Sequence, residues 1–480
     1  MTQQAVKKDK NILHFIVFCI IAAMGWVIPP VAPITVEGMR LLGIFVAAVY
    51  GWTVTSEIWP SLMTVILMPF TGLADLTTVL AGSWGGDTCL FIVLIMVLVA
   101  FLEATGTTTF IASYLMTRKM LAGHPWRLIF MLMLVAWVLS TLCGNMPGMF
   151  ITWGFIYKIC GILGYKPFDK FASLMVFGVA VMGAISLSTV PWNGNALVIL
   201  QSYTQSTGNT INFAHYLAYT IPVGLISIAG FLLLCKFVFR LDVSRLQNLD
   251  PGVFGEKDAK LNTERKIALA ALAILILMIV VPGLMPKTSL IGILGTKTGL
   301  SLKAMLVFAV LSLIRINGEQ IFNFAKLAAK GIHWNMIMMT VGIFCFVNLL
   351  SSQNAGIGAF LGKIFTPMFQ GVSPVVFFIL VTVITVALTN VMINMVVAVI
   401  MISATVPVAA SLGIPADQVV YLITVSCTIA FLLPPASAAS CVLFANTEWV
   451  RAKDVYTFAI PTVIMMAVVA LGWNLILFMF

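Results

Sequence analysis

The sequence predicts an all-α polytopic membrane protein of about 11 transmembrane helices plus two re-entrant hairpins, arranged as two inverted-topology repeats. The chain of 480 residues is 61% hydrophobic and only 9% charged, whereas soluble domains average about 25% charged residues. Apolar runs close to the roughly 17–25 residues that a helix needs to cross a bilayer recur from Ile12 to the C-terminus. Polar landmarks also recur at a constant offset between the two halves.

The N-terminal segment, residues 1–35, is predicted to be a helix that anchors the chain in the membrane. Its polar start holds three lysines, and an apolar run follows from Ile12 to Pro29. No small-residue cleavage site stands behind this run. This pattern is typical of a retained signal anchor rather than of a removed signal peptide.

The basic residues predict the orientation. The segment from Lys236 to Lys266 carries seven Lys or Arg, whereas the predicted outside segments before it, 30–37, 72–87 and 204–214, carry none. Because cytoplasmic loops hold the excess of Lys and Arg, we expect a cytoplasmic N-terminus, an outside C-terminus and a location in the cell (inner) membrane. The other basic residues are scattered at helix ends and form no stripe that would bind nucleic acid.

Two landmarks define the repeat. Ser140 and Asn145 recur as Thr385 and Asn390, since 385 minus 140 and 390 minus 145 are both 245. A second landmark, STVPWNGNALVIL from Ser188, meets LPPASAASCVLF from Leu433 at the same offset. An odd number of spans in each half makes the halves run oppositely through the membrane, as in many transporters.

The predicted domains follow from this repeat. They are the N-terminal helix 1–35, a first inverted repeat 36–240 with a hairpin at 127–163, a cytoplasmic linker 241–266, and a second inverted repeat 267–480 with a hairpin at 374–410. Each hairpin has apolar arms and a polar middle. Such non-helical backbone survives at membrane depth only where it is buried in protein or lines a wet cavity.

Broken helices are predicted at Thr189 to Asn195 and at Leu433 to Ser440, where prolines and small polar residues interrupt apolar helices. The N-terminus of a half-helix presents free N–H groups and a positive dipole end to an anion. Unwound carbonyl groups are suited to bind Na⁺. The two breaks therefore predict an anion site that needs no arginine.

Oxygen-bearing side chains at the hairpin tips fit a Na⁺ site. Ser140 with Asn145, and Thr385 with Asn390, offer hydroxyl and amide oxygens of the kind that hard cations prefer. The alternative is that these side chains only form hydrogen bonds between packed helices, which is common in membranes.

These residues resemble the divalent anion/sodium symporter family, within the broader ion transporter superfamily, over nearly the whole chain. The triplets Gly144-Asn145-Met146 and Thr389-Asn390-Val391 stand where the family has a Ser-Asn-Thr signature, and LEATG at 102–106 and FLLPPAS at 431–437 resemble two further family motifs. The resemblance implies an elevator-type transporter that forms a homodimer. It also implies two Na⁺ sites at the hairpin tips.

The resemblance and the predicted breaks together assign the site residues. The Na⁺ ligands are expected to be Ser140, Gly144, Asn145, Thr385, Leu388, Asn390 and Ala436. The substrate-binding residues are expected to be Asn145, Met146, Thr189, Asn193, Asn195, Thr389, Asn390, Val391, Ser437 and Ser440. Met146 and Val391 replace the threonines of the family signature, which makes the predicted pocket larger and more apolar.

The leading interpretation is a secondary active transporter of small organic anions of the di- or tricarboxylate type, with Na⁺ as the coupling ion. An anion exchanger of the same fold, or a carrier for a different, less charged anion, remains open. A channel is the alternative from another class, although ion pores are typically lined by rings of repeated charge. An enzyme would be expected to have a cluster of buried His, Asp, Glu or Cys, and no such cluster is visible in the sequence.

Overall fold

The computed structural model describes residues 2–479 apart from 56–57, 255–259, 286–287, 291–292, 294, 296–297, 351–352, 358, 361–362, 364–366, 368–370 and 434–435. Parts of the predicted linker and the two prolines of the second predicted break therefore lie outside the described residues. The described part is helical except for one antiparallel pair of two-residue strands.

The first part of the chain forms helices of very different lengths. They are α1 (Thr2–Val27), α2 (Val36–Val54), α3 (Trp59–Leu67), η1 (Met68–Thr71), α4 (Leu76–Ser83), α5 (Asp87–Ala104), α6 (Thr107–Met116), η2 (Lys119–Leu121), α7 (Pro125–Cys143), α8 (Asn145–Leu163), α9 (Lys170–Thr189), α10 (Gly194–Thr207), α11 (Phe213–Leu233), the π-helix η3 (Leu234–Val238), η4 (Ser244–Asn248) and η5 (Pro251–Phe254).

The second part repeats this mixture of long and short helices. Its elements are α12 (Thr263–Leu284), α14 (Leu300–Leu313), β1 (Arg315–Ile316), β2 (Glu319–Gln320), α15 (Phe324–Gly331), α16 (Trp334–Leu350), η6 (Gln353–Ala355), α18 (Pro374–Thr389), α19 (Asn394–Ser411), α20 (Ala416–Cys427), α21 (Ala438–Ala445) and α22 (Ala452–Met479).

Eight helices of the described part are long and apolar enough to cross a membrane, and further apolar helices are shorter. The prediction of a membrane-spanning, multi-pass, all-helical protein is therefore confirmed. The count of 11 crossings, the inverted repeats and the orientation stay predictions. The broken unit from Lys170 to Gln205 is the most enclosed of the eight, with 94% of its apolar window buried inside the protein.

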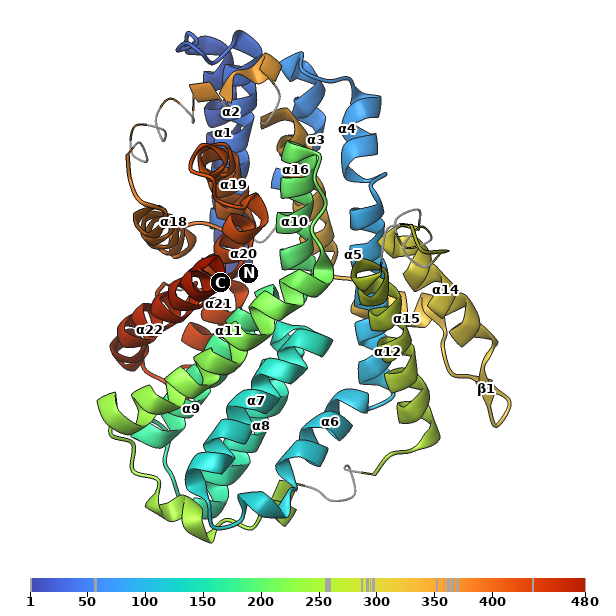
Figure 1. Cartoon of the computed structure of the whole chain (residues 1–480), viewed down its shortest axis with the longest axis vertical. Coiled ribbons are helices and arrows are strands. Elements are labelled where there is room, and N and C mark those ends of the chain that lie inside the picture. Colours follow the sequence, from blue (N-terminus) through green and yellow to red (C-terminus); the bar gives the residue numbers. More distant parts are fainter. Residues whose placement is uncertain are drawn as a thin grey trace.

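The hydrophobic interior divides into three clusters, and each draws on both parts of the chain. One lies mainly among α1–α5, α12 and α14–α16, and its large buried rings include Phe101 and Phe322. A second lies mainly among α6–α9, α11, α21 and α22, around Phe177 and Phe231. The third joins α10 and α11 to α18–α20 and is centred on buried tyrosines. Of the helices in the first cluster, α1–α4 lie at the opposite end of the molecule from the α7–α8 pair (Figure 1), whereas α5 contacts α7.

Both predicted hairpins are pairs of helices joined by short turns. In the first, α7 ends at Cys143 and α8 begins at Asn145, with Gly144 between them. In the second, α18 begins with Pro374 after the capping residue Ser373, a position where the missing proline N–H costs nothing. Figure 1 shows α7 and α8 side by side, and their residues are in contact along the pair.

Asp87 joins two distant parts of the fold. This residue begins α5, and its carboxylate accepts hydrogen bonds from the backbone N–H groups of Leu300 (2.7 Å) and Ser301 (3.1 Å) at the start of α14. The Ser301 hydroxyl also donates to it. A carboxylate at a helix N-terminus satisfies free N–H groups and complements the helix dipole.

We expect Asp87→Ala to lower the free energy of unfolding by about 0.5–2 kcal/mol, the usual cost of a lost N-cap. Asp87→Asn keeps one acceptor oxygen for α14 and should lose less. Thermal unfolding of the three forms in the same detergent measures this order. Equal unfolding midpoints for the wild type and Asp87→Ala would contradict the capping role.

Candidate functional site

The tip of the first hairpin is formed by Gly144. Its φ of 89° and ψ of 149° lie in a region that side-chain-bearing residues rarely adopt. This conformation lets the chain reverse between α7 and α8 within one residue. Across the turn, the hydroxyl Oγ of buried Ser140 lies 3.4 Å from the backbone oxygen of Asn145.

The two arms of this hairpin approach closely at Gly148. A Cβ atom at this position would meet the backbone nitrogen and the hydroxyl of Ser140 well inside van der Waals contact. Glycine is therefore required for α8 to lie against α7 at the tip. The same approach holds the Ser140 hydroxyl beside the turn.

The first helix break, residues 190–193, separates α9 from α10. Three side chains hold its upstream end. Nε1 of Trp137, in the first hairpin, donates to Thr189 Oγ1 at 2.9 Å. Two residues of α11 also contribute. The Thr220 hydroxyl donates to the Thr189 carbonyl at 2.6 Å, and the Tyr216 hydroxyl donates to the Ser188 carbonyl. The carbonyl groups that the break leaves without helical partners are thus satisfied by side chains.

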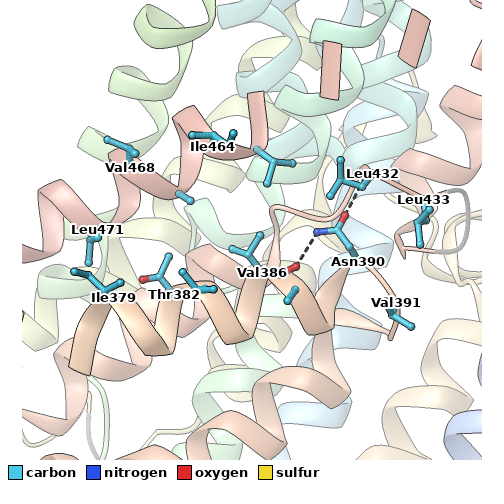
Figure 2. Close-up of a pocket in the computed structure, with 14 residues that line it drawn as sticks. Ile379, Thr382, Val386, Asn390, Val391, Leu432, Leu433, Ile464, Val468 and Leu471 are labelled. Atoms are coloured by element: carbon cyan, nitrogen blue, oxygen red, sulfur yellow. Dashed lines mark hydrogen bonds between the residues drawn. The ribbon is translucent and has the colours of Figure 1, made fainter. Parts of the chain in front are cut away.

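Asn390, at the tip of the second hairpin, holds the second break, residues 428–437. Its Nδ2 donates to the carbonyls of Val386 and Ile429, both at 2.8 Å, and its Oδ1 accepts from Leu432 N at 2.9 Å. Figure 2 shows this carboxamide between α18 and the unwound segment. Because Asn390 is only 4% exposed, its bonds to Ile429 and Leu432 fix the second tip to the second break, while the bond to Val386 orients the carboxamide on α18.

Other side chains reinforce the same contact. Thr389 Oγ1 lies 2.7 Å from the Cys427 carbonyl and 3.0 Å from Asn394 Oδ1. Within the break, Ser437 Oγ donates to the Ala430 carbonyl at 2.7 Å. Ser440 donates in the same way to Leu433 at 2.6 Å, and its N–H bonds to Ser437 Oγ.

The end of α9, just before the first break, meets the start of the second break in the interior. Ser188 Oγ and Thr428 Oγ1 lie 3.2 Å apart although 240 residues separate them in the chain, and both are buried. Each break is in turn bonded to its own hairpin, the first through Trp137 and the second through Asn390. The arrangement is one buried centre built from two hairpins and two interrupted helices.

The predicted site residues differ in accessibility. Eight of them are buried: Ser140, Thr189, Asn195, Thr385, Thr389, Asn390, Ala436 and Ser440. Six are half-buried: Gly144, Asn145, Met146, Asn193, Leu388 and Ser437. Val391 is exposed. The predicted residues of the second half gather around one unwound segment. No hydrogen bond within the described part of the chain joins the Asn145 tip to the Asn390 tip.

The two hairpin asparagines, paired by the sequence offset, have different environments. Asn390 uses its amide nitrogen and its oxygen within the protein. Among the described residues, nothing forms a hydrogen bond with the half-buried carboxamide of Asn145. The carboxamide at the first tip is therefore available to a ligand, whereas the carboxamide at the second tip forms hydrogen bonds within the protein.

Asn195 is the second residue of α10, directly after the first break. Its N–H bonds to Asn193 Oδ1 (3.1 Å), while its buried Nδ2 has no hydrogen-bond partner among the described residues. Leaving a buried donor unpaired costs about 1–3 kcal/mol. The start of α10 thus offers an anion a side-chain donor and the positive end of a helix dipole.

Sequence reasoning missed Trp137, Tyr216, Thr220 and Thr428, which hold the breaks. Each lies in an apolar run where its polar atom looks incidental. The one usable signal was chemical: a buried Trp or Tyr normally finds a partner for its N–H or O–H group. Their partners are break carbonyls and hydroxyls that are close only in the folded chain.

A polytopic helical fold with two hairpins and two broken helices around a buried polar centre is typical of a secondary transporter. The family model described as Citrate transporter matches residues 44–426. The chain therefore belongs to the citrate transporter family, of the ion transporter superfamily. It is a multi-pass membrane protein that transports organic anions, and not an enzyme.

The fold is similar to that of the YdaH transporter of Alcanivorax borkumensis, whose crystal structure is described as having an unusual topology. The TM-score is 0.56 at 16% sequence identity, and the match covers 84% of this chain and 87% of that chain. At this identity the likeness shows the fold alone. No curated protein matches the chain by sequence.

The superfamily implied by the hairpin-tip and helix-break motifs is thus confirmed. The divalent anion/sodium symporter family itself is not confirmed, because the matching family is the citrate transporter family. Na⁺ coupling, the elevator mechanism, the homodimer and the individual site residues stay predictions.

Proposed function

We propose that this protein is a Na⁺-coupled symporter of citrate-like di- and tricarboxylates. The observation that carries the anion site is the unpaired Nδ2 of Asn195, 4% exposed at the start of α10. A carboxylate oxygen is the acceptor that would pair this donor, and the α10 N-terminus would add to the attraction. The description of the matching family supports citrate as the reference substrate.

We place the principal Na⁺ site at the first hairpin tip. Ser140 Oγ is buried beside the turn, and the Asn145 carboxamide lies at the same turn with its oxygen uncommitted among the described residues. The second implied set, Thr385, Leu388 and Asn390, is a weaker candidate. There the Thr385 hydroxyl donates to the Val381 carbonyl and Asn390 holds the break.

An elevator movement within a homodimer completes the proposal. It rests on the resemblance to the divalent anion/sodium symporters. The hydrophobic cluster that lies mainly among α1–α5, α12 and α14–α16 supports it, since a scaffold needs an interior of its own. We assign these helices to the scaffold and both hairpins to the transport domain, with Cys143, Met395 and Val396 of the hairpins at the contact between the two parts.

Flux measurements in liposomes that contain the purified protein test the coupling. We expect an inward Na⁺ gradient, but not an equal K⁺ gradient, to drive ¹⁴C-citrate entry, and external citrate to increase ²²Na⁺ entry. Ser140→Ala should raise the Na⁺ concentration for half-maximal uptake. Thr152→Ala, which removes a hydroxyl that bonds only to the Gly148 carbonyl of the same helix, should not.

Citrate entry that ignores Na⁺ and requires citrate inside the liposomes would identify an exchanger and overturn the symport proposal. An unchanged Na⁺ dependence in Ser140→Ala would remove the Na⁺ site from the first hairpin.

A further inference from the structure

An apolar groove lies between α18 and α22, outside the polar centre. It encloses about 630 Å³, and its walls run along both helices to Leu432 and Leu433 of the second break. Figure 2 shows aliphatic side chains of the two helices facing each other across it. An apolar cavity of only about 150 Å³ already stays dry and binds small hydrocarbons, so this groove is ample for an apolar ligand.

The described lining residues of the groove offer no free side-chain hydrogen-bond donor to a ligand. Among its 14 lining residues only Thr382 and Asn390 carry polar side chains. The Thr382 hydroxyl donates its proton to the Phe378 carbonyl at 2.8 Å, and both amide hydrogens of Asn390 bond to backbone carbonyls. A polar or charged ligand would lose its hydration here without compensation. The occupant is therefore a hydrocarbon.

The corresponding place in the first half is filled by an indole ring. The predicted repeat offset of 245 pairs Thr382 with Trp137. Pro222 lies nine residues after the start of α11, and Pro461 lies nine residues after the start of α22. Aligning the two helices on these prolines pairs Gly224 with Val463, each two residues further on. The Trp137 ring packs directly on Gly224, whereas Thr382 and Val463 line the open groove.

The rim of the groove is apolar and exposed, as is typical of a surface that contacts lipid. Val383, Ile464 and Val468 are 59%, 60% and 61% exposed, and they lie on apolar helices, of which α22 is long enough to cross a membrane. The lining along α18 runs from Ile379 to Ala387, and Asn390 and Val391 continue it beyond the helix. At 1.5 Å per residue the helical part is about 12 Å long, close to one leaflet of the ~30 Å hydrocarbon core.

We propose that the groove between α18 and α22 binds one acyl chain of a membrane phospholipid, which fills the space that Trp137 fills between α7 and α11. The chain enters laterally across the rim formed by Val383 and Ile464. It wedges the second hairpin against the last helix, close to the contact of Asn390 with the second break. This inference does not depend on the transported substrate or on Na⁺ coupling.

Photolabelling tests the proposal in the full-length protein. The probe is phosphatidylethanolamine with a diazirine in its acyl chain, incorporated in liposomes, and labelled peptides are located by mass spectrometry. We expect labelling concentrated on residues 379–391 and 463–471. Thr382→Trp, which introduces the indole of the other half, should reduce this labelling at least fivefold, whereas Val376→Trp, an exposed position of α18 outside the groove, should leave it unchanged.

Labelling spread evenly over exposed α18 and α22 residues, or unaffected by Thr382→Trp, would overturn the proposal. Should Thr382→Trp fail to fold, Ala467→Phe fills the same groove from α22 and carries the same expectation. Efficient disulfide cross-linking of two Ile464→Cys chains in the liposomes, with no lipid label in the groove, would assign the groove to a second copy and also overturn it.

Discussion

Asn390→Ala is expected to impair transport strongly while the protein still reaches the membrane. The substitution leaves the Ile429 carbonyl and the Leu432 N–H of the second break without their partner on the hairpin. Each buried orphan costs about 1–3 kcal/mol, and about 1.4 kcal/mol already changes a rate or equilibrium tenfold. We therefore expect citrate uptake to fall at least about tenfold.

The measurement is initial uptake in liposomes with matched amounts of protein. Val376→Ala, at an exposed position of α18 outside the groove, is the control and should retain wild-type uptake. Retention of full uptake by Asn390→Ala would show that the bond between the second tip and the second break is dispensable, and the buried centre would lose its proposed role.

Gly148→Ala is expected to damage the first hairpin. The new methyl group would overlap the backbone nitrogen of Ser140, and backbone cannot yield as a flexible side chain does. Overpacking of this kind costs about 1–3 kcal/mol, and here it also displaces the Ser140 hydroxyl proposed to bind Na⁺. We expect a lower unfolding temperature and at least about a tenfold loss of Na⁺-driven uptake.

Gly154→Ala on the same helix provides the matched control. Nothing lies within 4 Å of a Cβ atom at Gly154, and alanine is the better helix former by about 1 kcal/mol. This variant should be as stable as the wild type or slightly more stable. If both substitutions had the same effect, the close approach of α7 and α8 would not explain the first.

Sequence patterns predicted the helical membrane class, because hydropathy acts locally along the chain. The second helix interruption begins earlier than predicted, after Cys427 rather than at Leu433, and α21 already begins at Ala438. The turn at Gly144 and the interruption after Thr189 lie where these patterns indicated. The organic-anion transporter class also followed from the motifs. The offset of 245 marked Asn145 and Asn390 as counterparts.

The pairing did not predict that these asparagines would have different roles. Whether an amide is saturated depends on which carbonyl groups stand opposite it, and Ile429 reaches Asn390 only through the tertiary fold. For the same reason the sequence alone does not distinguish Trp137 from an ordinary apolar residue, because the hydrogen bond from its ring nitrogen to Thr189 forms only in the folded chain. The groove at Thr382 depends on how α18 and α22 pack together in the fold, which no local pattern records.

The most direct test of the central claim is uptake by the purified protein in liposomes of radiolabelled citrate, succinate and sulfate under an inward Na⁺ gradient, beside Asn145→Ala and Asn390→Ala. The account predicts saturable accumulation of the carboxylates above equilibrium, dependent on Na⁺ and lost in both variants. Failure of all three anions to move, with or without Na⁺ or internal counter-substrate, would contradict it.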